Sequence, residues 1–237
     1  MATAAQIARF RETNAAIEAL SDRSLQRFFN ALDLARPRHA RDALLEFVPA
    51  LTTEFGEMSS LVAADWFDEL RSAEDLPRAF RAQMAAATPT DVVQQRVKYG
   101  ARHLFTPTPE LLLPFLQGAV QGYVLQPGRD TIQRSSIADP DAAGWHRETR
   151  PSETFASGCG FCNVLAGRGG VYKWDTAQFA SHDNCHCVAV PSWDQDAEEV
   201  PASAYVASAR TAGWSQADRD AHNAVIRDLA ALEDTRR

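Results

Sequence analysis

The chain has 237 residues, of which 45% are hydrophobic, and a formal net charge of −7. This length suits one large domain or two small ones, and the modest glycine and proline content argues against general disorder. The negative charge argues against a general nucleic-acid-binding protein, although a local basic patch is compatible with it. The most apolar stretch, 111–116, is short and contains Pro114, so no segment has the length of a membrane span.

The N-terminal region is amphipathic and charged rather than continuously apolar. We therefore expect no signal peptide, and a reducing cytoplasm as the place of synthesis. Residues 3–34 have apolar residues at helical spacing, and Ser21 and Asp22 are types that cap helices, so two helices are expected there. After a turn at 36–38, residues 40–71 have the pattern of one long helix or two shorter ones, with a kink at Pro49.

Three more helices are expected before residue 126. They are an alanine-rich helix over 78–87, a capped helix over 92–104, and an apolar helix over 110–125 that ends at Gln126-Pro127-Gly128. Gly118 and Gly122 mark places where a neighbour approaches closely. The aromatic residues at helical spacing indicate a packed core rather than a cofactor site. The sequence therefore predicts a mostly α-helical array as the first domain, residues 1–125.

The sequence changes character after this array. Alternating residue types predict a strand over 144–149, an extended pair at 171–172 and a second strand over 187–190. We assign 126–193 to a small α+β module and 194–237 to an acidic, exposed linker and a final helix capped near Ser215.

All four cysteines lie in this small module. Cys159 and Cys162 form a C-x-x-C pair, and His182, Cys185 and Cys187 form an H-x-x-C-x-C cluster. A tetrahedral zinc ion takes four Cys or His ligands, commonly supplied as two short chelating pieces. These five residues are therefore the candidate ligands of a structural zinc ion that staples the module.

Which four of the five donors bind is left open by the spacing. One arrangement uses the C-x-x-C pair, the histidine and one of the two late cysteines. His186 is the least expected ligand, because in a strand it faces away from Cys185 and Cys187.

Other uses of the cysteines are weaker alternatives. The C-x-x-C pair lacks the βαβ context of a redox motif, and two disulfides require an oxidising compartment. Inert buried thiols are a further alternative. A catalytic metal needs an open position and a general base, for which only Asp175 and Asp183 are available in this segment.

A longer series of residues surrounds the cysteines. It consists of 127–132, 139–140, 144–145, Arg147, 159–162, 165–166, 168–169, 171–172, 181–187 and 190–191. This series resembles the MuF-like minor capsid proteins of tailed phages, in particular the branch found in phages and prophages of actinobacteria. The likeness spans roughly residues 92–193, and the helical first half is similar to the general plan of that family.

The resemblance implies a structural virion protein concerned with head assembly or DNA delivery. Such a protein lies in the head interior or near the portal and is assembled in the host cytoplasm. The implied partners are the portal protein, the major capsid protein and scaffold proteins, with contact to packaged DNA as a further option and no membrane. The alternative is a capsid maturation protease or another hydrolase acting on scaffold or capsid protein, as some relatives are described. The sequence has no nucleophile-elbow pattern or clear Ser/His pair, so it favours the structural role.

Overall fold

The computed structural model describes residues 2–149, 166, 170–173, 179, 185–200, 215 and 217. The chain divides into two compact units, Met1–Ala202 and Ser203–Arg237. Only residues 215 and 217 of the second unit are described, so the expected C-terminal helix lies outside the described residues. The described part of the first unit contains four α-helices and one two-stranded sheet, which confirms a mostly helical fold.

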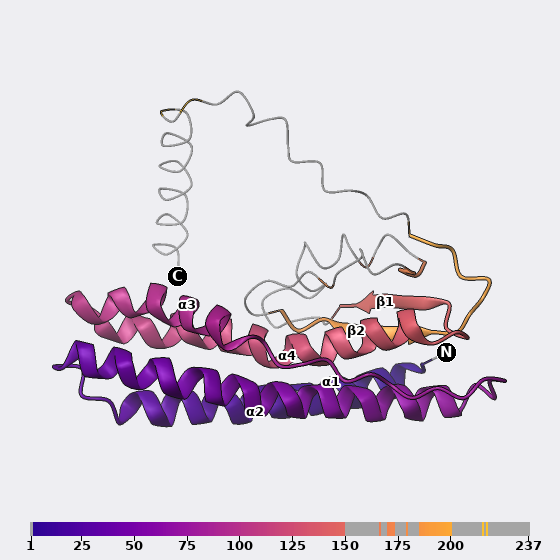
Figure 1. Cartoon of the computed structure of the whole chain (residues 1–237), viewed down its shortest axis with the longest axis horizontal. Coiled ribbons are helices and arrows are strands. Elements are labelled where there is room, and N and C mark those ends of the chain that lie inside the picture. The colour runs from indigo at the N-terminus through magenta and orange to yellow at the C-terminus, as the bar shows by residue number, and fades with distance from the viewer. Residues whose placement is uncertain are drawn as a thin grey trace. The chain divides into compact units, whose positions relative to one another are not determined.

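Two long helices, α1 (Ala4–Asn30) and α2 (Pro37–Ser72), lie side by side and are joined by a short connection (Figure 1). A capping box between Thr3 and Gln6 begins α1. Helix α2 contains Pro49 without being divided, so of the two predicted alternatives, one long helix or two shorter ones, the structure has the long helix.

The predicted break at Ser21 and Asp22 is wrong, because α1 is continuous there. The Ser21 hydroxyl donates a hydrogen bond to the carbonyl of Glu18 at 2.8 Å. Asp22 accepts hydrogen bonds from the side chains of Gln26 at 2.8 Å and Gln117 at 2.7 Å. Both potential capping groups are thus bonded inside the fold and do not compete for the backbone N–H groups of a new helix.

The segment 79–89 is extended, so the predicted alanine-rich helix is wrong. Its backbone is bonded to side chains of two helices instead of to itself. The N–H of Ala85 donates to Thr131 Oγ1 on α4 at 2.9 Å, and the carbonyl of Ala85 accepts from Ser60 Oγ on α2 at 2.8 Å. These tertiary contacts outweigh the intrinsic helix preference of alanine.

The chain then returns through α3 (Thr90–Gly100) and two short 3-10 turns, η1 (Ala101–Phe105) and η2 (Pro109–Leu111). Helix α4 (Leu112–Ala138) follows and packs against α1, α2 and α3. The predicted helix over 92–104 is therefore confirmed, with its last turn in 3-10 geometry.

Helix α4 does not end at Pro127 and Gly128 as predicted, and the division expected at residue 125 falls inside it. A Cβ atom placed on Gly128 would lie 2.4 Å from Ser59 Oγ and 2.9 Å from the Ser59 carbonyl oxygen. A Cβ on Gly122 would meet nothing within 4 Å. The close helix approach predicted at Gly122 is thus wrong for that residue, and α4 meets α2 closely at Gly128.

The sheet consists of β1 (Gly144–Glu148) and β2 (Val188–Ser192), which pair antiparallel and pack against α4. Tyr172 adds an isolated bridge to Trp145, so both predicted strands and the extended pair at 171–172 are confirmed. Gly144 has φ +143°, and a Cβ there would lie 2.4 Å from the Tyr172 carbonyl oxygen. Only glycine fits this start of β1.

Two hydrophobic clusters fill the described part of the first unit. One lies among α1, α2, α4 and the sheet and includes the stacked rings of Phe10 and Trp66, whose centroids are 4.1 Å apart. The other joins all four helices and includes Phe29, Leu44 and Leu104. The aromatic residues at helical spacing in α1 and α2 thus lie in the core or pack against it, as predicted. Among the described helices, none combines the length and hydrophobicity needed to cross a bilayer.

Candidate functional site

Helix α4 holds the backbone of the segment that carries Cys185 and Cys187. Arg129 exposes only 4% of its surface, and its Nε donates to the Cys187 carbonyl at 3.1 Å. A terminal nitrogen of the same guanidinium donates to the Cys185 carbonyl. Gln121, about two turns earlier, adds a longer contact of 3.5 Å to the Cys185 carbonyl. Charge-assisted hydrogen bonds from a buried guanidinium therefore fix both cysteines relative to the helices.

His186, between the two cysteines, is held by side chains of two helices. Its Nδ1 lies 3.2 Å from a carboxylate oxygen of Glu18 on α1 and 3.2 Å from the side-chain nitrogen of Gln121 on α4. A protonated Nδ1 donates to the carboxylate, and an unprotonated Nδ1 accepts from the amide. Either tautomer of His186 thus forms a hydrogen bond to a helix.

Phe179 provides a second attachment between the cysteine segment and the helices. Its N–H donates to Gln133 Oε1 at 3.0 Å, and its carbonyl accepts from Gln126 at 3.3 Å. The guanidinium carbon of Arg147 on β1 lies 3.6 Å from the ring centroid, and that of Arg129 lies 5.1 Å away. The ring thus lies within cation–π distance of two guanidinium groups, which is electrostatically favourable.

Three of the side chains that hold the cysteine segment lie in a row along α4, which the sequence did not predict. Gln121, Arg129 and Gln133 are separated by eight and four residues, which places them on one face of a helix. The signal is visible in the sequence only if the helix continues past Pro127. Since the predicted helix ended at 125, the row was divided between two predicted domains.

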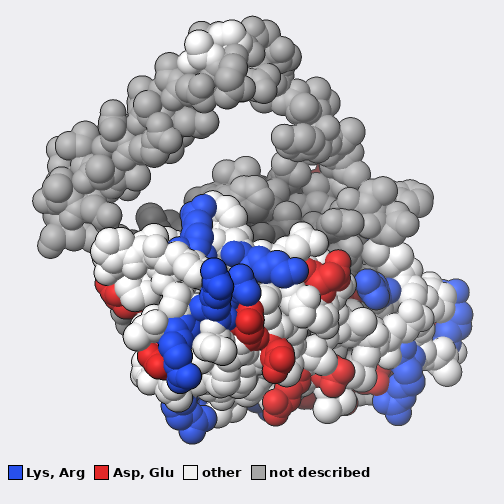
Figure 2. Space-filling model, turned by 60° about the vertical axis from the view of Figure 1, so that its left-hand side comes forward, with Lys and Arg blue, Asp and Glu red and all other residues white. Residues whose placement is uncertain are grey.

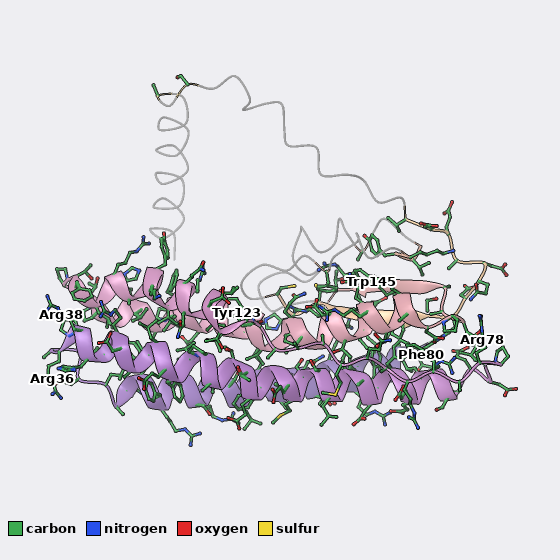
Figure 3. The ribbon with its side chains drawn as sticks, viewed as in Figure 1. Arg36, Arg38, Arg78, Phe80, Tyr123 and Trp145 are labelled. Carbon is green, nitrogen blue, oxygen red and sulfur yellow. The ribbon has the colours of Figure 1, made fainter. Side chains whose placement is uncertain are left out.

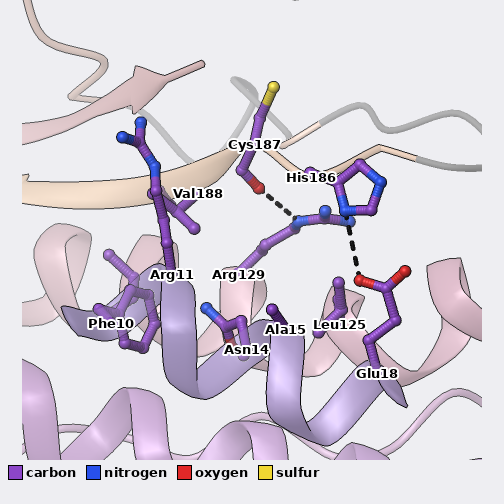
Figure 4. Close-up of a pocket in the computed structure, with 13 residues that line it drawn as sticks. Phe10, Arg11, Asn14, Ala15, Glu18, Leu125, Arg129, His186, Cys187 and Val188 are labelled. Atoms are coloured by element: carbon purple, nitrogen blue, oxygen red, sulfur yellow. Dashed lines mark hydrogen bonds and ion pairs between the residues drawn. The ribbon is translucent and has the colours of Figure 1, made fainter. Parts of the chain in front are cut away.

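A small cavity lies beneath residues 186–189, between α1 and α4 (Figure 4). Its volume of about 20 Å³ holds roughly one water molecule. Arg129 and His186 line it, whereas the sulfur of Cys187 points away from α1 in Figure 4. We call the hydrogen bonds from Gln121 and Arg129 to residues 185–187 the clamp. The cavity lies beside the clamp and is too small for an organic substrate.

Comparison with known protein families identifies the family of this chain. Residues 1–217 match the model of the family described as VG15 protein, which is phage-related. The chain belongs to the VG15 protein family. No curated protein and no solved structure shows significant similarity to the chain. The match makes this a phage protein, and it includes both the helices and the cysteine segment.

A buried ionic network joins α2 to the end of α4 in this VG15 protein. Arg71 on α2 binds Asp139 with two hydrogen bonds, of 2.8 and 3.1 Å, and Asp141 with one of 3.1 Å. Trp193, just after β2, donates from Nε1 to Asp139 at 2.9 Å. Arg78 covers Asp141 from the outside with an Nε hydrogen bond of 2.7 Å. The network therefore locks the segment after the second strand onto α2 and the end of α4.

The network shifts the pKa values of Asp139 and Arg71. Burial acts to raise the pKa of Asp139, but hydrogen bonds from Arg71, Trp193 and the Asp141 backbone outweigh it, so its pKa lies below the usual value. The hydrogen bond to Asp139 in turn raises the pKa of Arg71. Both groups remain charged at neutral pH, as a buried pair requires.

The five candidate metal ligands are only partly described. Cys185 and Cys187 are buried, with 2% and 4% of their surface exposed. Cys159, Cys162 and His182 lie outside the described residues. In the described ranges, no three His, Cys, Asp or Glu side chains form a group that holds a metal ion. The two described cysteines have the donor type that zinc takes and supply at most half of a four-ligand site.

Proposed function

We propose that this VG15 protein is a structural component of a phage head, a minor capsid protein that associates with the portal or the inner capsid surface. It acts in head assembly or DNA delivery and is built in the host cytoplasm. Portal, major capsid and scaffold proteins are its proposed partners.

The observation that carries this proposal is the family match over residues 1–217, which treats the helices and the cysteine segment as one unit of a phage protein. The clamp supports it in physical terms. Arg129, Arg71 and Asp139 are buried charges, and each is used to attach the C-terminal segment to the helices. This is the chemistry of a rigid assembly element, because buried, hydrogen-bonded charges fix one arrangement of parts.

We further propose a structural zinc ion within the cysteine segment. Its ligands come from Cys159, Cys162, His182, Cys185 and Cys187. The spacing of these residues, a C-x-x-C pair followed by an H-x-x-C-x-C cluster, is typical of two chelating pieces around one zinc ion. The adjoining sheet has only two short strands, so a metal ion would add to the support that packing against α4 provides.

The proposed location is tested on phage particles. Quantitative mass spectrometry of purified heads from a phage that encodes this chain should find it in few copies relative to the major capsid protein. Phage with the gene deleted should form heads of reduced infectivity or DNA content. Absence of the protein from both procapsids and mature heads refutes the proposal. Scaffold or capsid cleavage that stops in a folded Cys185→Ser variant identifies a protease instead.

The proposed zinc ion is tested on the purified full chain by native mass spectrometry and elemental analysis. One zinc per chain is expected, and a strong chelator should remove it and lower the melting temperature. Cys159→Ser/Cys162→Ser removes at least one ligand from any four of the five donors and should lose the metal, whereas the control variant His186→Ala should retain it. Equal zinc loss in the two variants, or two intact disulfides without metal, contradicts the proposal.

A further inference from the structure

The basic residues of this acidic chain are concentrated at one end of its helices. Residues 22–42 and 96–110 hold eight of the 24 Lys and Arg residues but only four of the 31 Asp and Glu residues. We call the eight basic residues the basic tip: Arg23, Arg27, Arg36, Arg38, Arg41, Arg96, Lys98 and Arg102. The local charge is positive although the whole chain carries −7.

The two sequence segments of the basic tip are brought together by the fold. The connection between α1 and α2 and the turn η1 share the hydrophobic cluster that contains Phe29, Ala40, Ala101 and Leu104. Arg36 and Arg38 lie at this end of the molecule (Figure 3). Figure 2 shows basic side chains gathered closely on the end of the helices that faces the viewer. The basic tip is therefore one surface feature built from α1, α2, α3 and η1.

Several of these cations are available to a partner. Arg38, Lys98 and Arg102 are exposed and form no ion pair with the residues that the structure describes. Arg36 and Arg41 each pair with a neighbouring aspartate on an exposed surface, where such pairs are weak and are exchanged readily.

Aromatic rings support the cations at the tip. The guanidinium carbon of Arg102 lies 3.9 Å from the ring centroid of Tyr99, and that of Arg96 lies 4.3 Å from the centroid of Phe115. Tyr99 is 54% exposed. Stacking on a ring orients a guanidinium and limits its freedom, so less entropy is lost when it meets an anion.

We propose that the basic tip binds the phosphate backbone of duplex DNA. Duplex DNA carries one negative charge per about 1.7 Å of its axis, a density that suits a broad group of cations better than an isolated carboxylate does. Outside residues 22–42 and 96–110, the sequence has 27 acidic and 16 basic residues, a net negative charge that repels DNA. The molecule therefore meets DNA end-on, with the sheet and the cysteine segment directed away from it.

The inference rests on the proposed function for its setting, since DNA is packaged in the phage head. The binding itself is tested with purified full-length protein and a fluorescein-labelled mixed-sequence duplex of about 30 base pairs, by anisotropy from about 50 mM to 300 mM salt. The tip variant is Arg38→Gln/Lys98→Gln/Arg102→Gln. The matched control is Arg9→Gln/Arg81→Gln/Arg134→Gln, which removes the same charge from exposed residues elsewhere.

Wild-type protein should bind with a strong salt dependence. Each lost phosphate contact should lower affinity about eightfold at 0.1 M salt and reduce the slope of log affinity against log salt by about 0.9. The tip variant should thus lose up to about 2.7 from the slope, and the control should lose little. Circular dichroism melting verifies that both variants are folded.

Three outcomes overturn the inference: no binding by wild-type protein at about 50 mM salt, equal losses in the two variants, or equally strong competition by polyglutamate, which indicates an acidic protein partner. The assay does not depend on location in the virion. A protein absent from heads that still binds DNA through its tip refutes the proposed function alone, and a head protein without DNA affinity refutes this inference alone.

Discussion

The close contact between α2 and α4 gives a sharp test of the fold with two glycines of one helix. In Gly128→Ala, the new Cβ would lie 2.4 Å from Ser59 Oγ and 2.9 Å from the Ser59 carbonyl oxygen. The hydroxyl can rotate away, but the carbonyl belongs to the backbone of α2, so the two helices must separate. In Gly122→Ala, the new methyl group meets nothing within 4 Å.

The two substitutions stabilise the helix itself by the same amount, but they differ in the free-energy cost of packing the new methyl group. Replacing a mid-helix glycine by alanine stabilises a helix by about 1 kcal/mol. Overpacking a tight contact costs about 1–3 kcal/mol, and the backbone contact at Gly128 places it near the upper value. Gly128→Ala should therefore lower the free energy of unfolding by about 2 kcal/mol, and Gly122→Ala should raise it by up to about 1 kcal/mol.

Urea unfolding followed by circular dichroism measures both free energies, provided the m-value is unchanged. Ser59→Ala is a further control, because the buried Ser59 hydroxyl has no hydrogen-bond partner among the described residues. Combined with Gly128→Ala, it should recover part of the loss by removing the 2.4 Å contact but not the 2.9 Å one. Equal stabilisation by alanine at 122 and 128 refutes the close crossing of α2 and α4 at Gly128.

Two further predictions concern the buried charges. Arg129→Met should lower the free energy of unfolding by about 2–4 kcal/mol in the same urea assay, because two buried carbonyls lose their charged donor. Exposed Arg134→Met is the control and should change it by less than about 0.5 kcal/mol. Similar values for the two variants would contradict the clamp. Asp139→Asn should lower the free energy of unfolding by about 1.5–3 kcal/mol at neutral pH, because Arg71 then keeps only Asp141 as an anionic partner. Folding lowers the pKa of Asp139, so its contribution to the free energy of unfolding is fully present above the unfolded pKa of about 3.9. That contribution is lost as the pH falls through the folded pKa. The difference in the free energy of unfolding between wild type and variant should therefore narrow below about pH 4. Exposed Asp33→Asn serves as the control and should show almost no gap at any pH, and a gap for Asp139→Asn that is constant down to about pH 2 would refute the linkage.

The helices with a clear apolar period were predictable from sequence, and their ends were less so. Periodicity reports which face is buried, and it located α1, α2 and α3 correctly. Ser21 and Pro127 are typical residues of helix boundaries, yet both lie inside helices. Their roles are set by partners far away in the chain: Pro127 packs near Gly56 on α2, where a Cβ would lie 3.3 Å from its ring.

The cysteine segment was identified from its residue types, whereas the clamp was not. Spacing alone singles out Cys185 and Cys187 because few proteins place thiols in this pattern. Arg129 and Gln121 have no such signal, since an arginine or glutamine on a helix is ordinarily exposed. Their burial follows from the long-range contact of α4 with residues 185–187, which a local pattern does not contain.

The extended segment 79–89 has a consequence for the order of folding. Its backbone bonds join Gln83 to Ser135 and Ala85 to Thr131, which are 52 and 46 residues apart. While the chain is being synthesised, the α1–α2 hairpin precedes the groups that hold this segment, and the Ala85 N–H has no Thr131 hydroxyl to bond until α4 has formed. We therefore expect the four helices to fold late, as one cooperative unit, once α4 has formed and packs over segment 79–89.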